Sequence, residues 1–445
     1  MRTLIENACI LTVNQRDEVL PSGCVVVEDG AIVSVSSERP AGGADRRIDA
    51  AGKVVMPGLV NAHTHLFQTL IRGVYEHMPF AEWLRRIYAC GRVLTPADCH
   101  ISAKLGALEA LHSGVTTLVD HHFLNRGAEL PSATIAGMRE LGPRTVLART
   151  IMDLGDLAPR EVLETAAEGL RSTEALMDAH RGDALLTLMT GPNTPGASAS
   201  AELSREVQRW AVDRGVRVSM HVAESLGITE GVRRQTGHEG IVAWLDAHDA
   251  LGPNTLAAHS VHLTPSEVGI CAGRGVSVSH NPVSNMFLGD GIAPVVEMIQ
   301  AGVNVALGTD GAASNNSQDM FEVLKMGALL QRARTLDPDA VTPAQAIRMA
   351  TINGARALGL DSVTGSLEPG KRADLIVLDL RGAAHTVAVH NVPSQVVYCA
   401  RPSNVQMVMV DGRVLLEHGE VLDFDEPRFL HEAQTAGEDL VRRLG

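Results

Sequence analysis

The sequence has few aromatic residues, few basic residues and no closely spaced cysteine pair, and each shortage excludes a class of protein. Phenylalanine, tryptophan and tyrosine make up 3% of the 445 residues, which argues against an aromatic stacking platform for single-stranded nucleic acid. The formal net charge is −14, so the chain offers no basic surface to a phosphate backbone. We therefore expect no nucleic-acid partner.

The cysteines and the longest uncharged stretches exclude further classes. The six cysteines include no CxxC pair, which favours neither a disulfide framework nor a thiolate zinc site, and we expect a reducing, cytoplasmic environment. The uncharged residues 54–71 and 382–400 are interrupted by histidine, proline and asparagine, whose polar groups would lack partners in lipid. We expect no signal peptide and no membrane-spanning segment.

What the sequence does contain is an alternation of short apolar runs with longer helical patterns. Residues 1–56 and 365–445 consist largely of short β-branched runs separated by turns, and we expect them to form one small β-sandwich domain, followed by a C-terminal helix. Residues 57–364 alternate strand and helix patterns, which is typical of a parallel sheet. Eight candidate strands lie at 56–61, 115–119, 145–148, 185–189, 216–220, 255–258, 276–279 and 303–307. The predicted fold class is therefore α/β, a (β/α)8 TIM barrel with a small β domain.

Four possible metal ligands follow candidate strands. His63 and His65 stand two residues apart after the first strand, so their side chains point to the same face. His221 and Asp310 follow the fifth and eighth strands, and a closed barrel brings strand ends to one mouth. Three imidazoles and a carboxylate suit one divalent ion, with zinc favoured and Fe2+ or Mn2+ also accepted. Alone, an HxH pair among 18 histidines is equally well explained by chance.

Two further residues are placed for proton transfer. Glu224 lies three residues after His221, where a carboxyl group can move protons near an attacking water, or be a solvated loop residue. His259 ends the sixth strand and either hydrogen-bonds that water or is a buried structural histidine. None of the four lysines follows the fourth strand, so we expect one metal ion rather than the lysine-bridged pair of cyclic-amide hydrolases.

Five motifs contain these histidines and carboxylates or lie beside them. They are Pro57-Gly-Leu-Val-Asn-Ala-His-Thr-His65, His221-Val-Ala-Glu224, Ala258-His259, Ser279-His-Asn-Pro282 and Gly308-Thr-Asp-Gly-Ala-Ala-Ser-Asn-Asn316. Together they resemble the amidohydrolase superfamily over nearly the whole chain. The resemblance is greatest to the aminohydrolase branch of 5-methylthioadenosine/S-adenosylhomocysteine deaminases, with 8-oxoguanine deaminase, melamine deaminase and atrazine chlorohydrolase as close relatives.

The resemblance implies roles for these residues in hydrolytic deamination. One divalent ion is bound by His63, His65, His221 and Asp310. Asp310 also takes a proton from the attacking water, Glu224 protonates the ring nitrogen beside the reacting carbon and delivers a proton to departing ammonia, and His259 steadies the water. The catalytic set is therefore Glu224, His259 and Asp310.

The same resemblance implies substrate contacts, with two departures. Glu82 matches an acidic residue that holds ribose hydroxyls, and Arg149 and Arg160 match substrate-contacting arginines of the adenosine-derivative deaminases. Asn193 stands where those deaminases usually have a histidine that reads the base. His122, in Asp120-His-His, matches the 8-oxoguanine deaminase and triazine hydrolase branch and is expected to line the pocket.

We therefore expect a hydrolytic deaminase of an adenosine derivative such as S-adenosylhomocysteine or 5-methylthioadenosine, and a homo-oligomer. One alternative is a deaminase of a free base such as 8-oxoguanine or a pteridine. Another is an s-triazine amino- or chlorohydrolase. An alternative of a different class is a non-catalytic barrel assembly protein, which would be expected to have lost metal ligands that this chain keeps.

Overall fold

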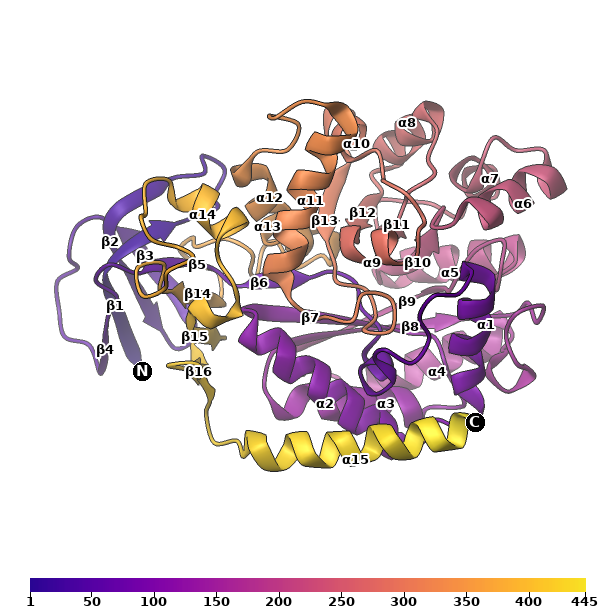
Figure 1. The fold of residues 1–445 in the computed structure, drawn as a ribbon, viewed down its shortest axis with the longest axis horizontal. Coiled ribbons are helices and arrows are strands. Elements are labelled where there is room, and N and C mark those ends of the chain that lie inside the picture. Colours follow the sequence, from indigo (N-terminus) through magenta and orange to yellow (C-terminus); the bar gives the residue numbers. More distant parts are fainter.

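Eight parallel strands form a barrel at the centre of the computed structural model, which describes all 445 residues (Figure 1). Each strand pairs with the next in chain order, and the Ala62 N–H donates to the Leu307 carbonyl at 3.0 Å, which links the last strand to the first. The predicted (β/α)8 fold is thus confirmed. The strands are β6 (Leu59–Asn61), β7 (Val115–His122), β8 (Arg144–Ile151), β9 (Leu186–Pro192), β10 (Val218–Val222), β11 (Thr255–His259), β12 (Ser277–His280) and β13 (Asn304–Leu307).

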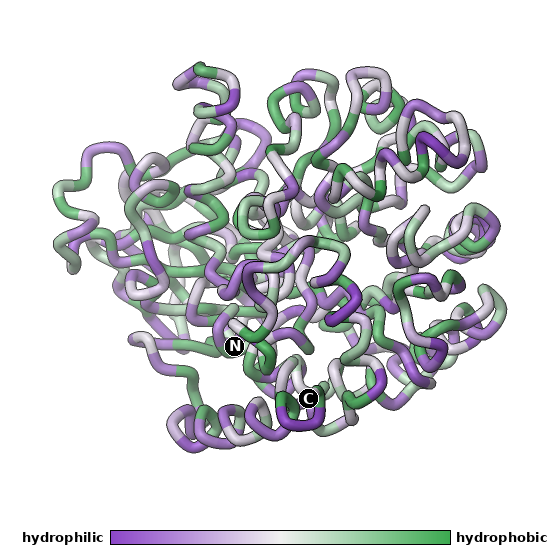
Figure 2. The backbone as a smooth tube through the Cα atoms, turned by 45° about the vertical axis from the view of Figure 1, so that its right-hand side comes forward, coloured by the Kyte–Doolittle hydropathy of each residue, from purple (hydrophilic) through white to green (hydrophobic).

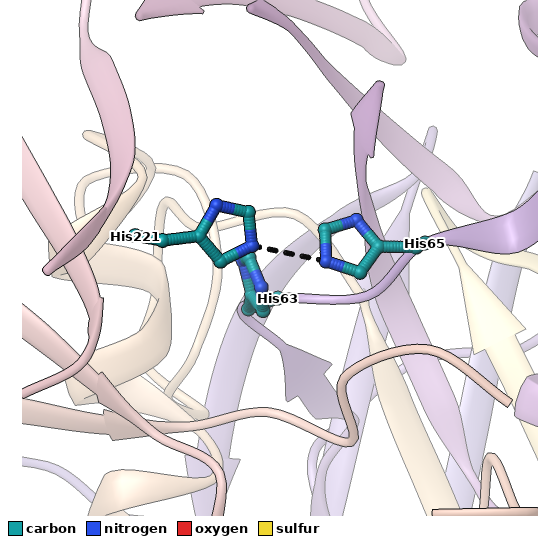
Figure 3. Close-up of side chains that lie close together, drawn as sticks. All are labelled: His63, His65 and His221. Atoms are coloured by element: carbon teal, nitrogen blue, oxygen red, sulfur yellow. Dashed lines mark hydrogen bonds between the residues drawn. The ribbon is translucent and has the colours of Figure 1, made fainter. Parts of the chain in front are cut away.

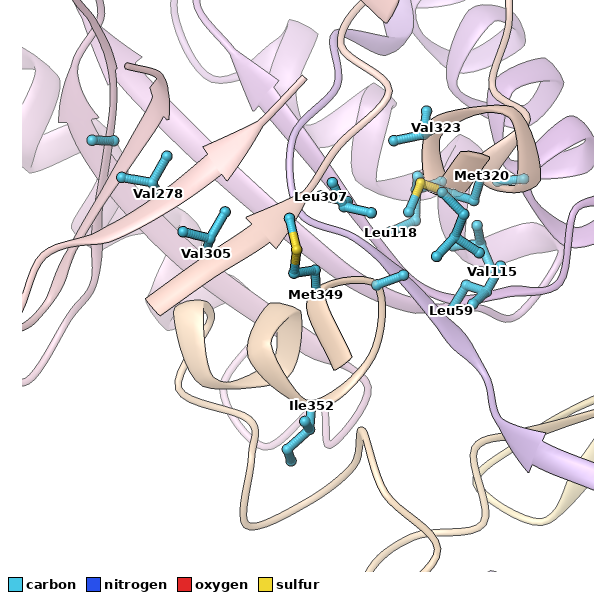
Figure 4. Packing of buried hydrophobic residues seen from close by; sticks show 14 of the residues in the cluster. Leu59, Val115, Leu118, Val278, Val305, Leu307, Met320, Val323, Met349 and Ile352 are labelled. Carbon is cyan, nitrogen blue, oxygen red and sulfur yellow. The ribbon is translucent and has the colours of Figure 1, made fainter. Parts of the chain in front are cut away.

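Helices surround the barrel and bury its outer face. In β6, Leu59 packs in the core shared with the helices and Val60 packs inside the barrel, as strand alternation requires. Figure 4 shows aliphatic side chains of this shared core between strands and helices, among them Leu307 and Met320. The helices are α1 (Phe80–Ala89), α2 (Pro96–His112), α3 (Glu129–Glu140), α4 (Ala166–Ala179), α5 (Ala201–Arg214), α6 (Leu226–Thr236), α7 (Ile241–Ala247), α8 (Pro265–Arg274), α9 (Pro282–Phe287), α10 (Val295–Gln300), α11 (Met320–Thr335), α12 (Pro343–Met349) and α13 (Ile352–Ala357), with 3-10 turns η1 (Leu66–Ile71), η2 (Cys90–Arg92) and η3 (Arg160–Val162).

The two ends of the chain meet in one nine-stranded mixed sheet beside the barrel (Figure 1). The predicted small β domain built from both ends is confirmed, and its strands are joined into a single hydrogen-bonded sheet through β5 and β14. In β14, Leu375 and Val377 face the domain's own core, whereas Ile376 and Leu378 pack in the large cluster shared with the barrel helices. The strands are β1 (Arg2–Leu11), β2 (Val19–Glu28), β3 (Ala31–Ser36), β4 (Arg46–Asp49), β5 (Val54–Pro57), β14 (Leu375–Leu378), β15 (Val405–Val410), β16 (Arg413–Glu417) and β17 (Glu420–Val421).

Two contacts fix the small sheet against the barrel. Gly58 joins β5 to β6, and a Cβ there would lie 2.0 Å from Cγ2 of Thr116, so only glycine fits. At the start of β8, the Arg144 Nε–H donates to a carboxylate oxygen of Asp374 at 2.7 Å, and both side chains are buried. Breaking such a buried pair costs about 3–5 kcal/mol, because one charge is left without a partner.

The chain ends in α15 (Glu426–Leu444), which packs along α2 and η1, preceded by α14 (Val392–Tyr398) and the turn η4 (Pro402–Asn404). Phe429, Ala433 and Leu440 are its buried residues, and in Figure 2 its tube changes between purple, white and green along its length, as expected of a helix with one apolar face. No helix of the chain is both long and apolar enough to span a membrane.

Candidate active site

Three histidines and one aspartate converge at the carboxyl-terminal end of the barrel. His63 and His65 follow β6, His221 lies in β10, and Figure 3 shows the three rings facing one another. The Nε2 atoms of His65 and His221 are 3.1 Å apart. Asp310, just after β13, places Oδ1 3.1 Å from the His65 Nε2 and 3.5 Å from the His63 Nε2. The structure therefore brings together the four predicted ligands, all of them buried.

Backbone carbonyls orient two of these rings so that their lone pairs face inward. The His65 Nδ1–H donates to the carbonyl oxygen of His121 at 2.8 Å, and the His221 Nδ1–H donates to that of Asn193 at 3.0 Å. Both Nε2 atoms are then acceptors, so their 3.1 Å approach is not a hydrogen bond and calls for a cation between them. Two nitrogens on one tetrahedral zinc are about 3.3 Å apart, given bonds of about 2.0–2.1 Å. The donor set fits such an ion.

Burial keeps these imidazoles neutral, which is the form that binds a metal. Burial lowers the pKa of His63, and burial together with the neighbouring histidines lowers the pKa of His221 well below its usual value. Neither ring nitrogen of His63 has a hydrogen-bond partner. A buried polar group without a partner is rare, and a bound ion would satisfy it.

Asp310 is held with one carboxylate oxygen free. Its Oδ2 accepts hydrogen bonds from Ser284 Oγ at 2.6 Å and Ser314 Oγ at 3.0 Å, whereas Oδ1 has no hydrogen-bond partner. Burial alone would raise the pKa of Asp310, but contacts with His63 and His65 outweigh it and hold the pKa well below its usual value. Oδ1 is therefore an ionised donor aimed at the histidine cluster.

Glu224 is also a buried carboxyl group, and its pKa is shifted in the opposite direction to that of Asp310. It is 7% exposed, and its Oε1 lies 3.6 Å from the Nε2 of His259. Burial, followed by the charges of Asp290 and Asp310, raises the pKa of Glu224 well above its usual value. A raised pKa favours the protonated form of a carboxyl group, which is the form that serves as a general acid.

Asp290 is a second buried carboxyl group on this side of the cluster. It is 8% exposed, its Oδ2 has no hydrogen-bond partner, and burial raises its pKa to about 7. Sequence reasoning missed it, because Gly289-Asp290-Gly291 has the composition of an ordinary turn. Its position follows from the loop after α9, where the Asp290 N–H donates to the Asn285 carbonyl at 2.9 Å.

Replacing Asp290 with asparagine is expected to shift the pH dependence of activity. Removing a nearby negative charge makes Glu224 easier to ionise, so the pKa of Glu224 falls and the alkaline limb of kcat/KM moves to lower pH, by on the order of one unit. A pH profile of the zinc-loaded enzyme measures this shift. Asp319→Asn, which changes the cap residue of α11, is the matched control. An alkaline limb that stays in place in Asp290→Asn would contradict the coupling.

Asn193 was predicted to contact substrate, but its side-chain amide is hydrogen-bonded to residues around the histidine cluster. Its Nδ2 donates to the Tyr88 hydroxyl at 2.9 Å and to Ser198 Oγ at 3.2 Å, and its Oδ1 accepts from the His121 Nε2 at 3.2 Å. Its carbonyl oxygen orients His221, as described above. A substrate contact by this side chain would have to replace one of these bonds.

The structure does not bring His122 or Arg149 to the cluster. In β7 the ring centroid of His121 lies 4.4 Å from that of His221. Because side chains alternate along a strand, His122 points to the other face, where its Nδ1 lies 3.2 Å from Asp120 Oδ2. Arg149 is fully buried behind β8 and donates to both carboxylate oxygens of Glu164, at 2.6 and 2.8 Å. A substrate role for Arg149 would require this pair to open.

The other two predicted substrate residues are exposed. Glu82 lies in the first turn of α1, and its Oε1 lies 3.6 Å from the Nη2 of Arg86. The neighbouring Trp83 donates from Nε1 to the Ala313 carbonyl at 3.0 Å, which holds α1 against the loop that carries Asp310. Arg160 begins η3, and its side chain makes no hydrogen bond or ion pair. Their contacts with substrate stay predictions.

Comparisons with known proteins agree with this geometry. The Amidohydrolase family profile matches residues 54–415. A 5'-deoxyadenosine deaminase of Methanosarcina mazei is 38% identical over 99% of both chains, and a 5-methylthioadenosine/S-adenosylhomocysteine deaminase of Syntrophomonas wolfei is 34% identical over 99% of this chain and 100% of its own.

Two solved structures share the whole fold. An adenosine deaminase from Xanthomonas campestris with bound zinc superposes with a TM-score of 0.92 at 31% identity, covering 99% of this chain and 98% of its own. Atrazine chlorohydrolase TrzN from Arthrobacter aurescens, complexed with zinc, also has a TM-score of 0.92, at 26% identity over 98% of this chain and 100% of its own. The profile match and the full-length relatives show that this chain belongs to the amidohydrolase family.

Proposed function

We propose that this protein is a zinc-dependent hydrolytic deaminase of adenosine derivatives. The observation that carries the proposal is a four-donor metal site beside two buried carboxyl groups whose pKa values are shifted in opposite directions, raised in Glu224 and lowered in Asp310. Groups whose environments push their pKa values apart divide the roles of acid and base. The deaminases among the full-length relatives support the reaction and the substrate class.

His63, His65, His221 and Asp310 would hold the ion. When bound, it lowers the pKa of a coordinated water and so supplies a nucleophile at neutral pH. Asp310, ionised and with Oδ1 free, takes one proton from the attacking water as oxygen bonds to the ring carbon that bears the amine. Glu224 at the same time gives its proton to the neighbouring ring nitrogen.

The second half of the reaction breaks the carbon–nitrogen bond. Asp310, and not Glu224 as expected from the resemblance, passes its proton to the amine, because Glu224 has already given its own proton to the ring nitrogen. The amine leaves as ammonia, and the electron pair of the new hydroxyl group forms the ring carbonyl. The remaining hydroxyl proton returns to Glu224. Both carboxyl groups are then in their starting states, so each turnover consumes one water and releases one ammonia.

The substrate class can be tested by ammonia release. Zinc-loaded enzyme is given 5'-deoxyadenosine, 5-methylthioadenosine, S-adenosylhomocysteine, adenosine, adenine, 8-oxoguanine and melamine, with chloride release from atrazine measured alongside. We expect the highest kcat/KM on the nucleosides, at least about tenfold above free adenine, because two hydrogen bonds to sugar hydroxyls are worth at least that factor. Activity only on free bases or triazines would overturn the nucleoside assignment.

The predicted homo-oligomer is a separate prediction, and light scattering of the purified protein checks it.

A further inference from the structure

His259 is oriented in the opposite sense to His65 and His221. Those two rings donate from Nδ1 to backbone carbonyls, whereas the His259 Nδ1 is approached by amide NH2 groups, from Asn285 at 2.9 Å and from Asn281 at 3.4 Å. An NH2 group can only donate, so the His259 Nδ1 must accept. The ring proton of neutral His259 is therefore on Nε2.

Two observations support this orientation. The Asn281 Oδ1 accepts from Ser279 Oγ at 2.9 Å, so the Asn281 amide has a partner for its oxygen while its NH2 group is directed at His259. The Nε2 is buried without a hydrogen-bond partner and lies 3.6 Å from Glu224 Oε1.

The tautomer matters because His259 lies close enough to the cluster to bind the ion. Together with His63 and Asp310 it forms a second group of donors whose atoms all lie within 4.8 Å of one another. With a lone pair on Nε2 it would be a fourth imidazole ligand. With a proton on Nε2 it presents a hydrogen-bond donor.

We propose that Asn285 is a positioning residue that keeps the proton of His259 on Nε2, so that this ring donates to the attacking water instead of binding the metal. The helix α9 that carries Asn285 also carries Ser284, which fixes Asp310 through its Oδ2. Adjacent residues of one short helix thus orient both the base and the donor. The proposal rests on the proposed function for the attacking water and for the rate measurement, whereas the tautomer and its effect on metal binding are tested without a substrate.

The test reverses the hydrogen bond. In Asn285→Asp a carboxylate replaces the NH2 group and accepts from Nδ1–H, which frees the Nε2 lone pair. Cobalt(II)-loaded protein reports the result by its visible spectrum, because cobalt with an added ligand absorbs more weakly. We expect a weaker spectrum, tighter zinc binding in competition with a chelator, and a kcat lowered about 10²-fold or more with KM within a few-fold.

Asn254→Asp is the matched control, since it places the same new carboxylate at the opposite end of the barrel, where Asn254 donates to the Val216 carbonyl. It should keep the wild-type spectrum and rate. A wild-type cobalt spectrum in folded Asn285→Asp would overturn the proposal even if the enzyme has another substrate. An inactive wild-type enzyme with a changed Asn285→Asp spectrum would overturn only the proposed function.

A double-mutant cycle keeps the proposal testable if Asn285→Asp does not fold. Asn285→Ala is compared in the wild-type and His259→Gln backgrounds by kcat and by the cobalt spectrum. If Asn285 acts through His259, its removal lowers kcat about tenfold in the first background and changes it less than about twofold in the second. Equal losses in both backgrounds would assign Asn285 a structural role and overturn the proposal.

Discussion

Glu224→Gln is expected to lower kcat by about 10³-fold while the protein keeps its zinc. Glutamine has the shape of the protonated acid and fills the same buried site, but its amide cannot give up a proton to a ring nitrogen. Glu224 makes no hydrogen bond to any of the four ligands, and its Oε1 lies 3.6 Å from the Nε2 of His259. The metal site should therefore survive a change that removes the acid.

Steady-state kinetics on the best nucleoside and metal analysis of the same preparation check this result together. Glu267→Gln is the matched control: Glu267 is also fully buried, but its oxygens accept the backbone N–H groups of Val242 and Thr264. The glutamine oxygen can keep the bonds of one carboxylate oxygen but not of both, so the control should be less stable while it keeps its zinc and its rate. Turnover by Glu224→Gln within tenfold of wild type would remove Glu224 from the proton path.

The fold could be predicted because its signals are local and repeated. Each barrel strand is a short apolar run, and the strands found differ from those predicted mainly at their ends. The largest difference lies at residues 56–61, predicted as one strand and observed as the end of β5 and all of β6. Gly58 separates them, since the close approach to Thr116 leaves no room for a side chain. That contact depends on β7, so the sequence of the segment does not reveal it.

The direction of side chains could have been predicted in part. Strand alternation places His121 on the same side of β7 as Val119, which packs inside the barrel, so a longer predicted strand would have favoured His121 over His122 for a place near the metal. Because the predicted strand ended at Val119, the alternation was not extended to His121 and His122. The same reasoning separates Ala148, inside the barrel, from Arg149, outside it.

The residues that orient the site could not be predicted from single motifs. Ser284, Asn285 and Asp290 follow β12 and act on groups at neighbouring strand ends, which are His259 at the end of β11, Asp310 after β13 and Glu224 after β10. Their partners are 26 residues away in the two hydrogen bonds, and their spacing matches no ligand pattern. Only the closed barrel, which brings successive strand ends to one mouth, places them beside His259, Asp310 and Glu224.

Asp310→Asn is expected to remove both zinc and activity, because of how Asp310 is held. Two serine hydroxyls donate to Oδ2, so the amide oxygen of asparagine takes that position and its NH2 group takes the position of Oδ1. An NH2 group has no lone pair for a metal and cannot accept the proton of the attacking water. The histidines would then face a donor where they now face an ionised oxygen.

We expect the zinc affinity of Asp310→Asn to fall by at least about 10²-fold, because mutating residues that only hydrogen-bond a metal ligand already lowers metal affinity by about 10–100-fold. We expect kcat to fall at least as far as in Glu224→Gln. Chelator competition measures the affinity, and kinetics at saturating zinc separates the lost ligand from the lost base. Asp319→Asn serves again as control, since asparagine caps a helix as well as aspartate does. If Asp310→Asn binds zinc normally but is inactive, Asp310 is the base and not a ligand. If saturating zinc restores its turnover, Asp310 is a ligand and another group takes the proton of the attacking water.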